Sequence, residues 1–378
     1  MRLDQLPKPI FVANPDSLQQ MIDDLAEQSI IAVDTEANSL YAYRERVCLI
    51  QFSTPESDYL LDTLALQDLS SLAPVFSNPK IEKVFHAAEY DIIILRHDFD
   101  FSFSRIFDTM VAARILGWNA VGLGSLLASE FGIHANKKYQ RADWGRRPLP
   151  QEMLTYAQMD THFLIALRNQ MKTALKARKR WDLALEDFKR SCYMNGHSDR
   201  TPGDVCWRIK GASDLQPQQA AVLRELCIYR DLEARAINRP LFKVIGNQVL
   251  IELSKIWPST IKQIQSIQGI SPRQAHRLGP GILAAIQRGQ QTEPPRVARS
   301  PRRNNAHLDR IDRLRNWRKN KAKNLGVQSD IILPKDILHK IAAENPSTGE
   351  KLASVMDSLP WRFGRFGDEI LKQLMSSK

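Results

Sequence analysis

The sequence predicts an α/β domain with a mixed sheet, followed by two all-α helical domains. Over residues 1–170, apolar strand-like runs alternate with amphipathic helical segments, which is the pattern of an α/β architecture. Beyond residue 205, helix signals dominate and strand signals are few. The charge also changes along the chain, from a net −7 over residues 1–170 to +18 over residues 171–378, within a total of +11.

The first domain is expected to open with a helix over 17–28 and a strand over 30–36. Strands are then expected over 47–53 and 59–61, and the short turn between them favours an antiparallel meander. One more strand is expected at 83–85, and further helices at 68–77, 88–97, 108–116, 122–131 and 150–170. Helical crossovers would add later strands in parallel, giving a mixed sheet.

The rest of the chain divides by composition. The expected segments are a sheet domain at 1–170, a basic helical junction at 171–205, a helical domain at 206–289, a cationic linker at 290–305 and a second helical unit at 306–378. Loop signals at Asn195-Gly196 and Pro202-Gly203 end the junction, and Pro294-Pro295 and Ser300-Pro301 interrupt the linker. Four arginines make the linker cationic: Arg296, Arg299, Arg302 and Arg303.

The two helical segments resemble each other and suggest a diverged internal repeat, in which Leu223-Arg224-Glu225 corresponds to Leu314-Arg315-Asn316. In the first, helices are expected over 218–236, 251–256 and 261–267, then from Ser271 onward. Gly279-Pro280-Gly281 is expected to interrupt before a last helix at 282–288.

Composition excludes several classes of protein. No apolar run approaches the roughly 18 residues needed to span a bilayer, and the N-terminus lacks a secretory apolar region, so a soluble cytoplasmic protein is expected. None of the four cysteines is spaced as C-x-x-C, so we expect reduced packing thiols and no zinc site: Cys48, Cys192, Cys206 and Cys227.

The basic rear of the chain suits a polyanion such as RNA or DNA, although an excess of positive charge can also serve solubility alone. Cations recur around Trp317 and predict a surface that follows RNA: Arg313, Arg315, Arg318, Lys319, Lys321 and Lys323. The alternative is a solvated helix face with Trp317 and Leu314 in the core, and both can hold together.

Four acids occupy places where apolar elements normally carry none. Asp34 and Glu36 lie two apart on a strand and therefore point to one face, and Asp91 begins an apolar helix. Asp160 follows Tyr156 by one helical turn. If the four acids converge, two such charges about 5 Å apart cost roughly 3 kcal/mol per pair. Divalent cations would remove that repulsion, whereas each acid taken alone is equally compatible with a solvated strand end or a helix cap.

Taken together, these residues resemble the DEDD 3′→5′ exonuclease superfamily of RNase H-like fold, tyrosine type, and within it the ribonuclease D family. The motifs are Asp34-Thr35-Glu36, His86 with Asp91, and Tyr156 with Asp160. Supporting runs are Cys48-Leu49-Ile50-Gln51-Phe52, Phe107-Asp108-Thr109 and Tyr139-Gln140-Arg141-Ala142-Asp143-Trp144. Residues 215–289 resemble the helicase-and-RNase-D C-terminal (HRDC) domain, and 306–378 a second copy.

The resemblance implies two Mg²⁺ or Mn²⁺ ions held by the four acids, with Tyr156 orienting the attacking water. It implies 3′→5′ removal of nucleoside 5′-monophosphates from single-stranded RNA ends, with tRNA precursors as substrate. A monomer is expected, because the helical domains could fold back into a ring around the active-site cleft. Candidate substrate contacts are His86, Lys137, Lys138, Gln140, Trp144 and Arg147. For His86 and Trp144, packing in the core is favoured over substrate contact, and for the two lysines a solvated loop is an equal alternative.

Ala142 stands where the family often has serine, which leaves substrate contacts there open. The alternatives are a DNA exonuclease of the same superfamily and a non-catalytic RNA-binding protein. No phosphate-binding G-x-x-x-x-G-K-[ST] motif occurs, which disfavours a fused helicase.

Overall fold

The computed structural model describes residues 6–134, 137–194, 205–295 and 305–375. The chain forms two compact units. Unit 1 comprises residues 1–37, 47–196 and 300–378, and unit 2 comprises residues 38–46 and 197–299. The last helical segment thus groups with the sheet domain, a division that the composition of the chain does not predict. The junction loop signals and most of the cationic linker lie outside the described residues.

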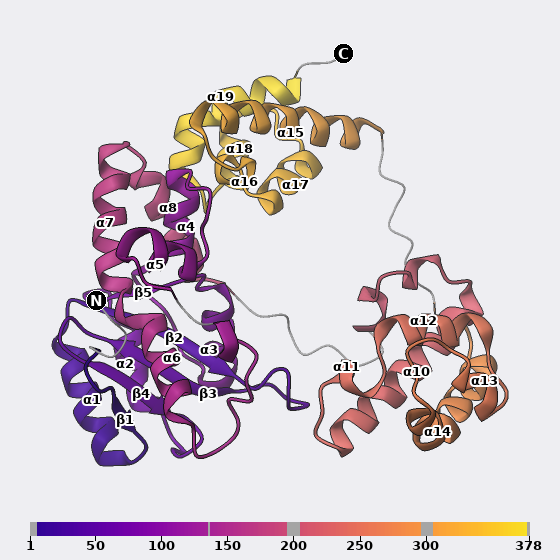
Figure 1. Ribbon diagram of the computed structural model, residues 1–378. Coiled ribbons are helices and arrows are strands. Elements are labelled where there is room, and N and C mark those ends of the chain that lie inside the picture. The colour runs from indigo at the N-terminus through magenta and orange to yellow at the C-terminus, as the bar shows by residue number, and fades with distance from the viewer. Residues whose placement is uncertain (1–5, 135–136, 195–204, 296–304, 376–378) are drawn as a thin grey trace. The chain divides into compact units, whose positions relative to one another are not determined.

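A six-stranded mixed sheet forms the centre of unit 1 (Figure 1). Its strands are β1 (Ile10–Val12), β2 (Ile30–Ala37), β3 (Val47–Ser53), β4 (Asp58–Asp62), β5 (Glu82–Phe85) and β6 (Ile106–Asp108), in the order β1-β4-β3-β2-β5-β6. β2, β3 and β4 form an antiparallel meander, and β5 and β6 continue parallel to β2. The mixed α/β sheet predicted from the sequence is confirmed.

Helices cover this sheet: α1 (Pro15–Glu27), α2 (Ala73–Ser77) after the 3₁₀ turn Ser70–Leu72, α3 (Glu89–Phe99), α4 (Thr109–Leu116), α5 (Leu123–Phe131), α6 (Gln151–His162), α7 (Leu164–Ala177) and α8 (Trp181–Ser191). A 3₁₀ turn covers Lys137–Tyr139. Asn14 caps α1 in a reciprocal capping box with Ser17, and Pro15 occupies the first turn.

Sequence patterns missed the short strands β1 and β6 because three residues carry too little periodicity. The helix expected over 150–170 is two helices, which divide at Phe163.

The last helical segment of unit 1 consists of α15 (Asn305–Leu325), α16 (Ser329–Ile332), α17 (Lys335–Glu344), α18 (Gly349–Val355) and α19 (Pro360–Met375). Trp317 and Leu314 lie in its core, as the alternative interpretation of the basic stripe predicted. Lys321 is paired with Glu369 at 2.8 Å, and Arg318 donates to the carbonyl of Leu333. Some of the cationic residues around Trp317 therefore form contacts within the last helical segment.

A buried arginine joins this last segment to α8. Arg362 is 0% exposed and contacts both Glu186 and Asp187 of α8, and it also donates to the carbonyl of Ile331. At the rim, Arg114 of α4 pairs with Asp330. A buried guanidinium with acceptors on several sides is the arrangement in which an internal ion pair is tolerated.

Unit 2 is helical, with 3₁₀ turns at Cys206–Arg208 and Ala212–Asp214. Its helices are α10 (Pro217–Ala236), α11 (Leu241–Val244), α12 (Asn247–Ile256), α13 (Ile261–Gln265) and α14 (Pro272–Gln291). The predicted interruption at Gly279-Pro280-Gly281 is wrong, because α14 runs through Pro280. A Cβ at Gly289 would lie 2.5 Å from Val222 Cα, so the close approach of the α10 and α14 backbones requires glycine there.

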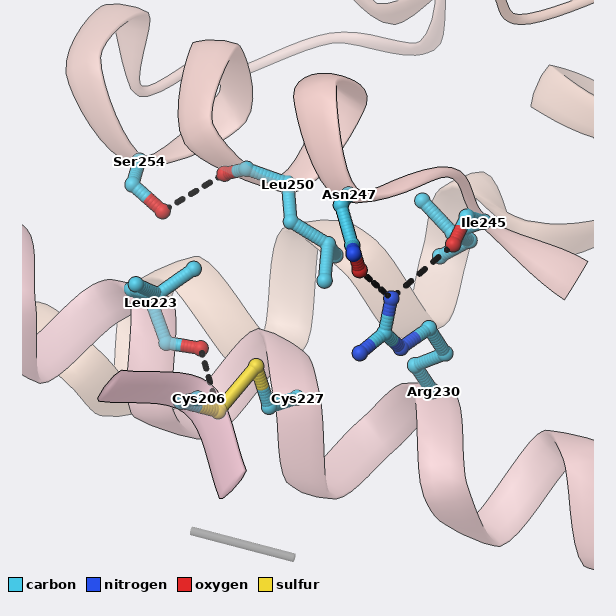
Figure 2. Close-up of a disulfide and its surroundings, with 8 residues drawn as sticks. All are labelled: Cys206, Leu223, Cys227, Arg230, Ile245, Asn247, Leu250 and Ser254. Carbon is cyan, nitrogen blue, oxygen red and sulfur yellow. Dashed lines mark hydrogen bonds between the residues drawn. A yellow bond between two sulfur atoms is a disulfide. The ribbon is translucent and has the colours of Figure 1, made fainter. Parts of the chain in front are cut away.

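The expectation of reduced cysteines fails in unit 2, where Cys206 and Cys227 form a disulfide (Figure 2). The two residues are 21 apart in the sequence, a spacing that carries no motif. The bond fastens the 3₁₀ turn at Cys206 to the middle of α10. Cys48 and Cys192 are buried thiols.

No helix in the described part of the chain is both long and apolar enough to cross a membrane.

Candidate active site

The acidic motifs meet at one cavity of about 360 Å³ in unit 1. Its walls include Asp34 and Glu36 of β2, together with Tyr156 and Asp160 of α6. The alternation of the strand directs the two β2 acids to the same face, and the one-turn spacing directs the two α6 residues to the same side of the helix. Residues more than a hundred positions apart in the sequence are thereby brought together.

Asp91 lies immediately behind this wall, in the first turn of α3. The hydroxyl of Thr35, which stands between the two β2 acids, donates a hydrogen bond to Asp91 Oδ1. Asp91 is 5% exposed, so it contributes charge to the cavity from a protected position.

The carboxyl groups act on one another electrostatically. Burial, followed by repulsion from Asp91, Asp160 and Glu36, raises the pKa of Asp34 well above its usual range. Burial and then Asp91 raise the pKa of Asp160 to about 7, against the opposing hydrogen bond from Tyr156. Burial also raises the pKa of Asp91 to about 7, and the Thr35 hydroxyl opposes that shift. The protein thus holds acids together in a place where their ionised forms are costly.

Tyr156 keeps its proton in this setting. Burial, and then the negative charges of Asp160, Glu36 and Asp34, raise the pKa of its phenol far above the ordinary value. A phenol that stays protonated donates a hydrogen bond and does not accept a proton. Its ring packs beside Trp144 and Tyr139, with centroids 6.1 Å apart in each case, which fixes its direction.

His86 lines the cavity and is neutral, because burial lowers its pKa to about 4. Its Nδ1 lies 2.9 Å from the Thr109 hydroxyl, which itself donates to the carbonyl of Phe85. Both interpretations offered for His86 therefore fit: it is hydrogen-bonded within the fold and it also faces the cavity.

Asp108 is a supporting residue that enters the sequence argument only through the family resemblance. Its carboxylate accepts from the backbone N–H groups of Ala87 and Ala88 before α3 and from Met110 and Val111 at the start of α4. It therefore ties the segment that carries His86 to the helix that follows β6. An Asp directly before a helix is its only local signal, and that signal indicates a cap.

A second buried carboxylate fixes the position of α6. Asp58 accepts hydrogen bonds from Ser53 Oγ at 2.6 Å, Gln158 Nε2 at 2.6 Å and His162 Nδ1 at 2.8 Å. Gln158 also donates to the carbonyl of Pro7. Gln158 and His162 belong to the same helix as Tyr156 and Asp160, so this network sets the rotation and register of the helix.

The remaining candidate substrate residues divide into two groups. Gln140 lines the cavity, and Lys138 is exposed with its ammonium 5.1 Å from the Tyr139 ring centroid. The side chain of Lys137 lies outside the described residues.

Trp144 fits the packing interpretation, and Arg147 has an ion-pair partner within the fold. Trp144 is 1% exposed in a core with Cys48 and Leu49, so no ring face is open for stacking on a base. Arg147 contacts both carboxylate oxygens of Asp62 at 2.6 Å and donates to the carbonyl of Cys48. Its guanidinium holds the segment before α6 against β3 and β4.

The donor set of the cavity suits hard divalent cations, since it consists of carboxylate oxygens with a strong mutual repulsion that a cation would relieve. Among the residues that the structure describes, no three His, Cys, Asp or Glu side chains already stand close enough to form a metal cluster.

Comparison with known proteins agrees with this geometry. Residues 9–176 match the family described as 3′-5′ exonuclease, and residues 219–286 and 307–374 each match the HRDC domain. The double match confirms the internal repeat.

Among curated relatives, the chain is 35% identical to the exosome complex exonuclease RRP6 of Saccharomyces cerevisiae, covering 68% of this chain and 37% of that protein. It is 28% identical to ribonuclease D of Nitrobacter hamburgensis, covering 92% of this chain and 90% of that protein. The chain spans about a third of the length of the first curated relatives it matches. The fold is similar to the crystal structure of Escherichia coli RNase D, with a TM-score of 0.73, 21% identity and coverage of 98% and 99%.

Proposed function

Because the chain belongs to the ribonuclease D family of 3′–5′ exonucleases with HRDC domains, we propose that it shortens RNA from the 3′ end by metal-dependent hydrolysis. The single observation that carries this proposal is the meeting of Asp34, Glu36, Asp160 and Tyr156 at one cavity, with Asp91 directly behind it. No stability requirement explains four mutually repelling acids at one place.

In this proposal Asp34, Glu36, Asp91 and Asp160 hold two divalent cations, Mg²⁺ or Mn²⁺. Such ions supply Lewis-acid stabilisation of the phosphate charge and favour ionisation of water. Tyr156, whose O–H bonds to Asp160, orients the attacking water through its phenol oxygen, and its raised pKa argues against a role as the base.

The reaction is hydrolysis of the terminal phosphodiester. A water oxygen forms a bond to phosphorus, the bond from phosphorus to the 3′ oxygen breaks, and that oxygen takes up a proton. The products are a nucleoside 5′-monophosphate and an RNA one residue shorter with a new 3′ hydroxyl. His86 and Gln140, both at the cavity, are the proposed contacts to the terminal nucleotide. Trimming of tRNA precursors by a monomer is the physiological role we propose.

The test uses RNA labelled at the 5′ end, matched DNA, and a tRNA precursor with a 3′ extension, each with Mg²⁺ or Mn²⁺. We expect a ladder of RNA products one nucleotide apart, lost with chelator and in Asp34→Asn. Asp23→Asn, a surface change, serves as the matched control and should be active. Cleavage of DNA alone would move the assignment to a DNA exonuclease, and RNA binding without cleavage to a binding protein. Degradation that persists in Asp34→Asn would refute the assigned site.

A further inference from the structure

Unit 1 holds a second cavity, of about 490 Å³, that contains none of the candidate catalytic residues. Its walls combine cations with aromatic rings: Arg105, Lys172 and Lys189, with Trp181, Phe188 and Tyr193. We call it the basic–aromatic cavity. A hollow of this size with both kinds of group is suited to a ligand that is itself anionic and aromatic.

The basic–aromatic cavity lies at the opposite end of the parallel strands from the catalytic acids. It contacts Glu82 and Ile106, the first residues of β5 and β6, whereas His86 follows the last residue of β5. β2, β5 and β6 run in parallel, and Asp34 and Glu36 lie in the second half of β2. The three residue steps of β5 alone separate the two ends by about 10 Å.

Cations outnumber acids in this cavity. Glu82 is the one acid on its described wall, and it is paired with Arg168 and, at 3.9 Å, with Arg105, which leaves Lys172 and Lys189 without an acid of the cavity wall. Lys189 is exposed, and its ammonium group makes no hydrogen bond or ion pair with any residue that the structure describes. Burial, followed by repulsion from Arg168, lowers the pKa of Lys172. Lys176 and Arg105 lower it further, and attraction to Glu82 partly opposes the shift. Positive charge is therefore concentrated here beyond what the local acid offsets.

The aromatic side is partly open. Tyr193 is 70% exposed and Leu185 is 44% exposed, although both adjoin the cavity. The ammonium groups of Lys172 and Lys176 lie 5.3 and 5.9 Å from the Trp181 ring centroid. Rings beside cations offer stacking for a base and charge for the adjacent phosphate.

We propose that the basic–aromatic cavity binds one nucleotide unit of an RNA strand whose 3′ end occupies the catalytic cavity. Lys172 and Lys189 contact the phosphate, and Tyr193 stacks on the base. The inference rests on the proposed function only for the identity of the strand. It adds an anchoring position that short substrates cannot reach.

The experiment measures binding of the full chain to a single-stranded RNA 20-mer by fluorescence anisotropy, in chelator and over a range of salt. Lys172→Gln/Lys189→Gln is compared with Lys8→Gln, which neutralises an exposed lysine of the same domain. We expect the double variant to bind about tenfold more weakly. The log–log salt slope should fall by about 0.7, corresponding to one phosphate of a single strand that is no longer neutralised. Tyr193→Ser should bind about fivefold more weakly with an unchanged slope, because stacking releases no counterions.

Hydrolysis of a trinucleotide provides the second measurement. It should proceed at the wild-type rate in the double variant, because so short a substrate fills only the catalytic cavity. Unchanged 20-mer binding in the double variant would overturn the proposal and leave the cavity to a protein partner. Equal losses for the 20-mer and the trinucleotide would also overturn it, by indicating damage to the fold. If the wild-type protein hydrolyses no RNA at all, the proposed function is refuted. The 20-mer binding measurement would still test whether the basic–aromatic cavity binds RNA.

Discussion

Replacing Asp58 with asparagine tests whether the buried network beneath α6 positions the catalytic side chains. Asp58 is 5% exposed and accepts three hydrogen bonds, two of them from α6. A hydrogen bond to a charged group contributes about 1 kcal/mol more than a neutral one, so the loss of charge assistance in three bonds amounts to about 3 kcal/mol. We therefore expect Asp58→Asn to lower the free energy of unfolding by about 3 kcal/mol at pH 7.

The pH dependence provides an independent check. Burial alone would raise the pKa of Asp58, but hydrogen bonds from His162, Gln158 and Ser53 outweigh it and lower the pKa below its ordinary value. A carboxyl group with a lowered pKa stabilises the fold above its unfolded pKa of about 3.9, and that contribution is lost as the pH falls through the folded pKa. The difference between wild type and Asp58→Asn should therefore shrink below about pH 4.

The assays are urea unfolding in metal-free buffer and steady-state hydrolysis of a trinucleotide. Because Tyr156 and Asp160 share the helix with Gln158 and His162, we expect kcat to fall about tenfold or more while KM changes little. Asp23→Asn, which alters an exposed acceptor of Gln19, should stay within about 0.5 kcal/mol of wild type. A stability loss with unchanged kcat would refute the positioning role, and no loss at all would refute the energetic argument.

Three further predictions concern other parts of the chain. In metal-free protein, Asp34→Asn should raise the free energy of unfolding at pH 8 by about 2 kcal/mol, because one member of the repelling set is gone. A carboxyl group with a raised folded pKa loses stability as the pH rises from its unfolded pKa of about 3.9 through its folded pKa, so the gain should shrink at pH 5 and disappear below about pH 4, and a denaturant series at pH 8, 5 and 4 checks this. Arg362→Met should lower the free energy of unfolding by about 3–5 kcal/mol, because Glu186 is left buried without its partner. Urea unfolding measures this loss, with the exposed Arg365→Met as control. A loss below about 1 kcal/mol would contradict the buried network. Reduction of the Cys206–Cys227 bond should lower the stability of unit 2 by about 3 kcal/mol, as expected for a closed loop of this length. Thermal melting with and without reductant measures this loss. The double variant Cys206→Ser/Cys227→Ser is the control, because reductant should not change its melting.

The sequence predicted those features that have a local signature. The strands at 30–37 and 47–53 are apolar runs bounded by turns, and the acid spacing on β2 and α6 follows from strand and helix periodicity. The convergence of Asp34, Asp91 and Asp160 was not deducible from spacing alone, because it depends on parallel crossovers that bring distant elements to one edge. Only the family resemblance supplied it.

What escaped prediction is set by tertiary contacts. The sequence favours core packing for Trp144, and the structure places it in a core, but no local pattern predicts that Arg147 pairs with Asp62. Pro280 looks like a helix end, but the packing of α14 against α10 carries the helix through it. The disulfide joins residues on two elements whose proximity no short motif encodes.

The attachment of the final helical domain through Arg362 has a consequence for synthesis. Glu186 belongs to an early part of the chain, whereas its cationic partner is translated 176 residues later. Throughout that interval the ribosome-bound nascent chain carries a carboxylate designed for burial with nothing to neutralise it. A fragment cut after residue 299 would lack Trp361 and Arg362, the partners of Glu186, and would expose the face of α8 that the last segment covers unless residues 300–378 are supplied in trans.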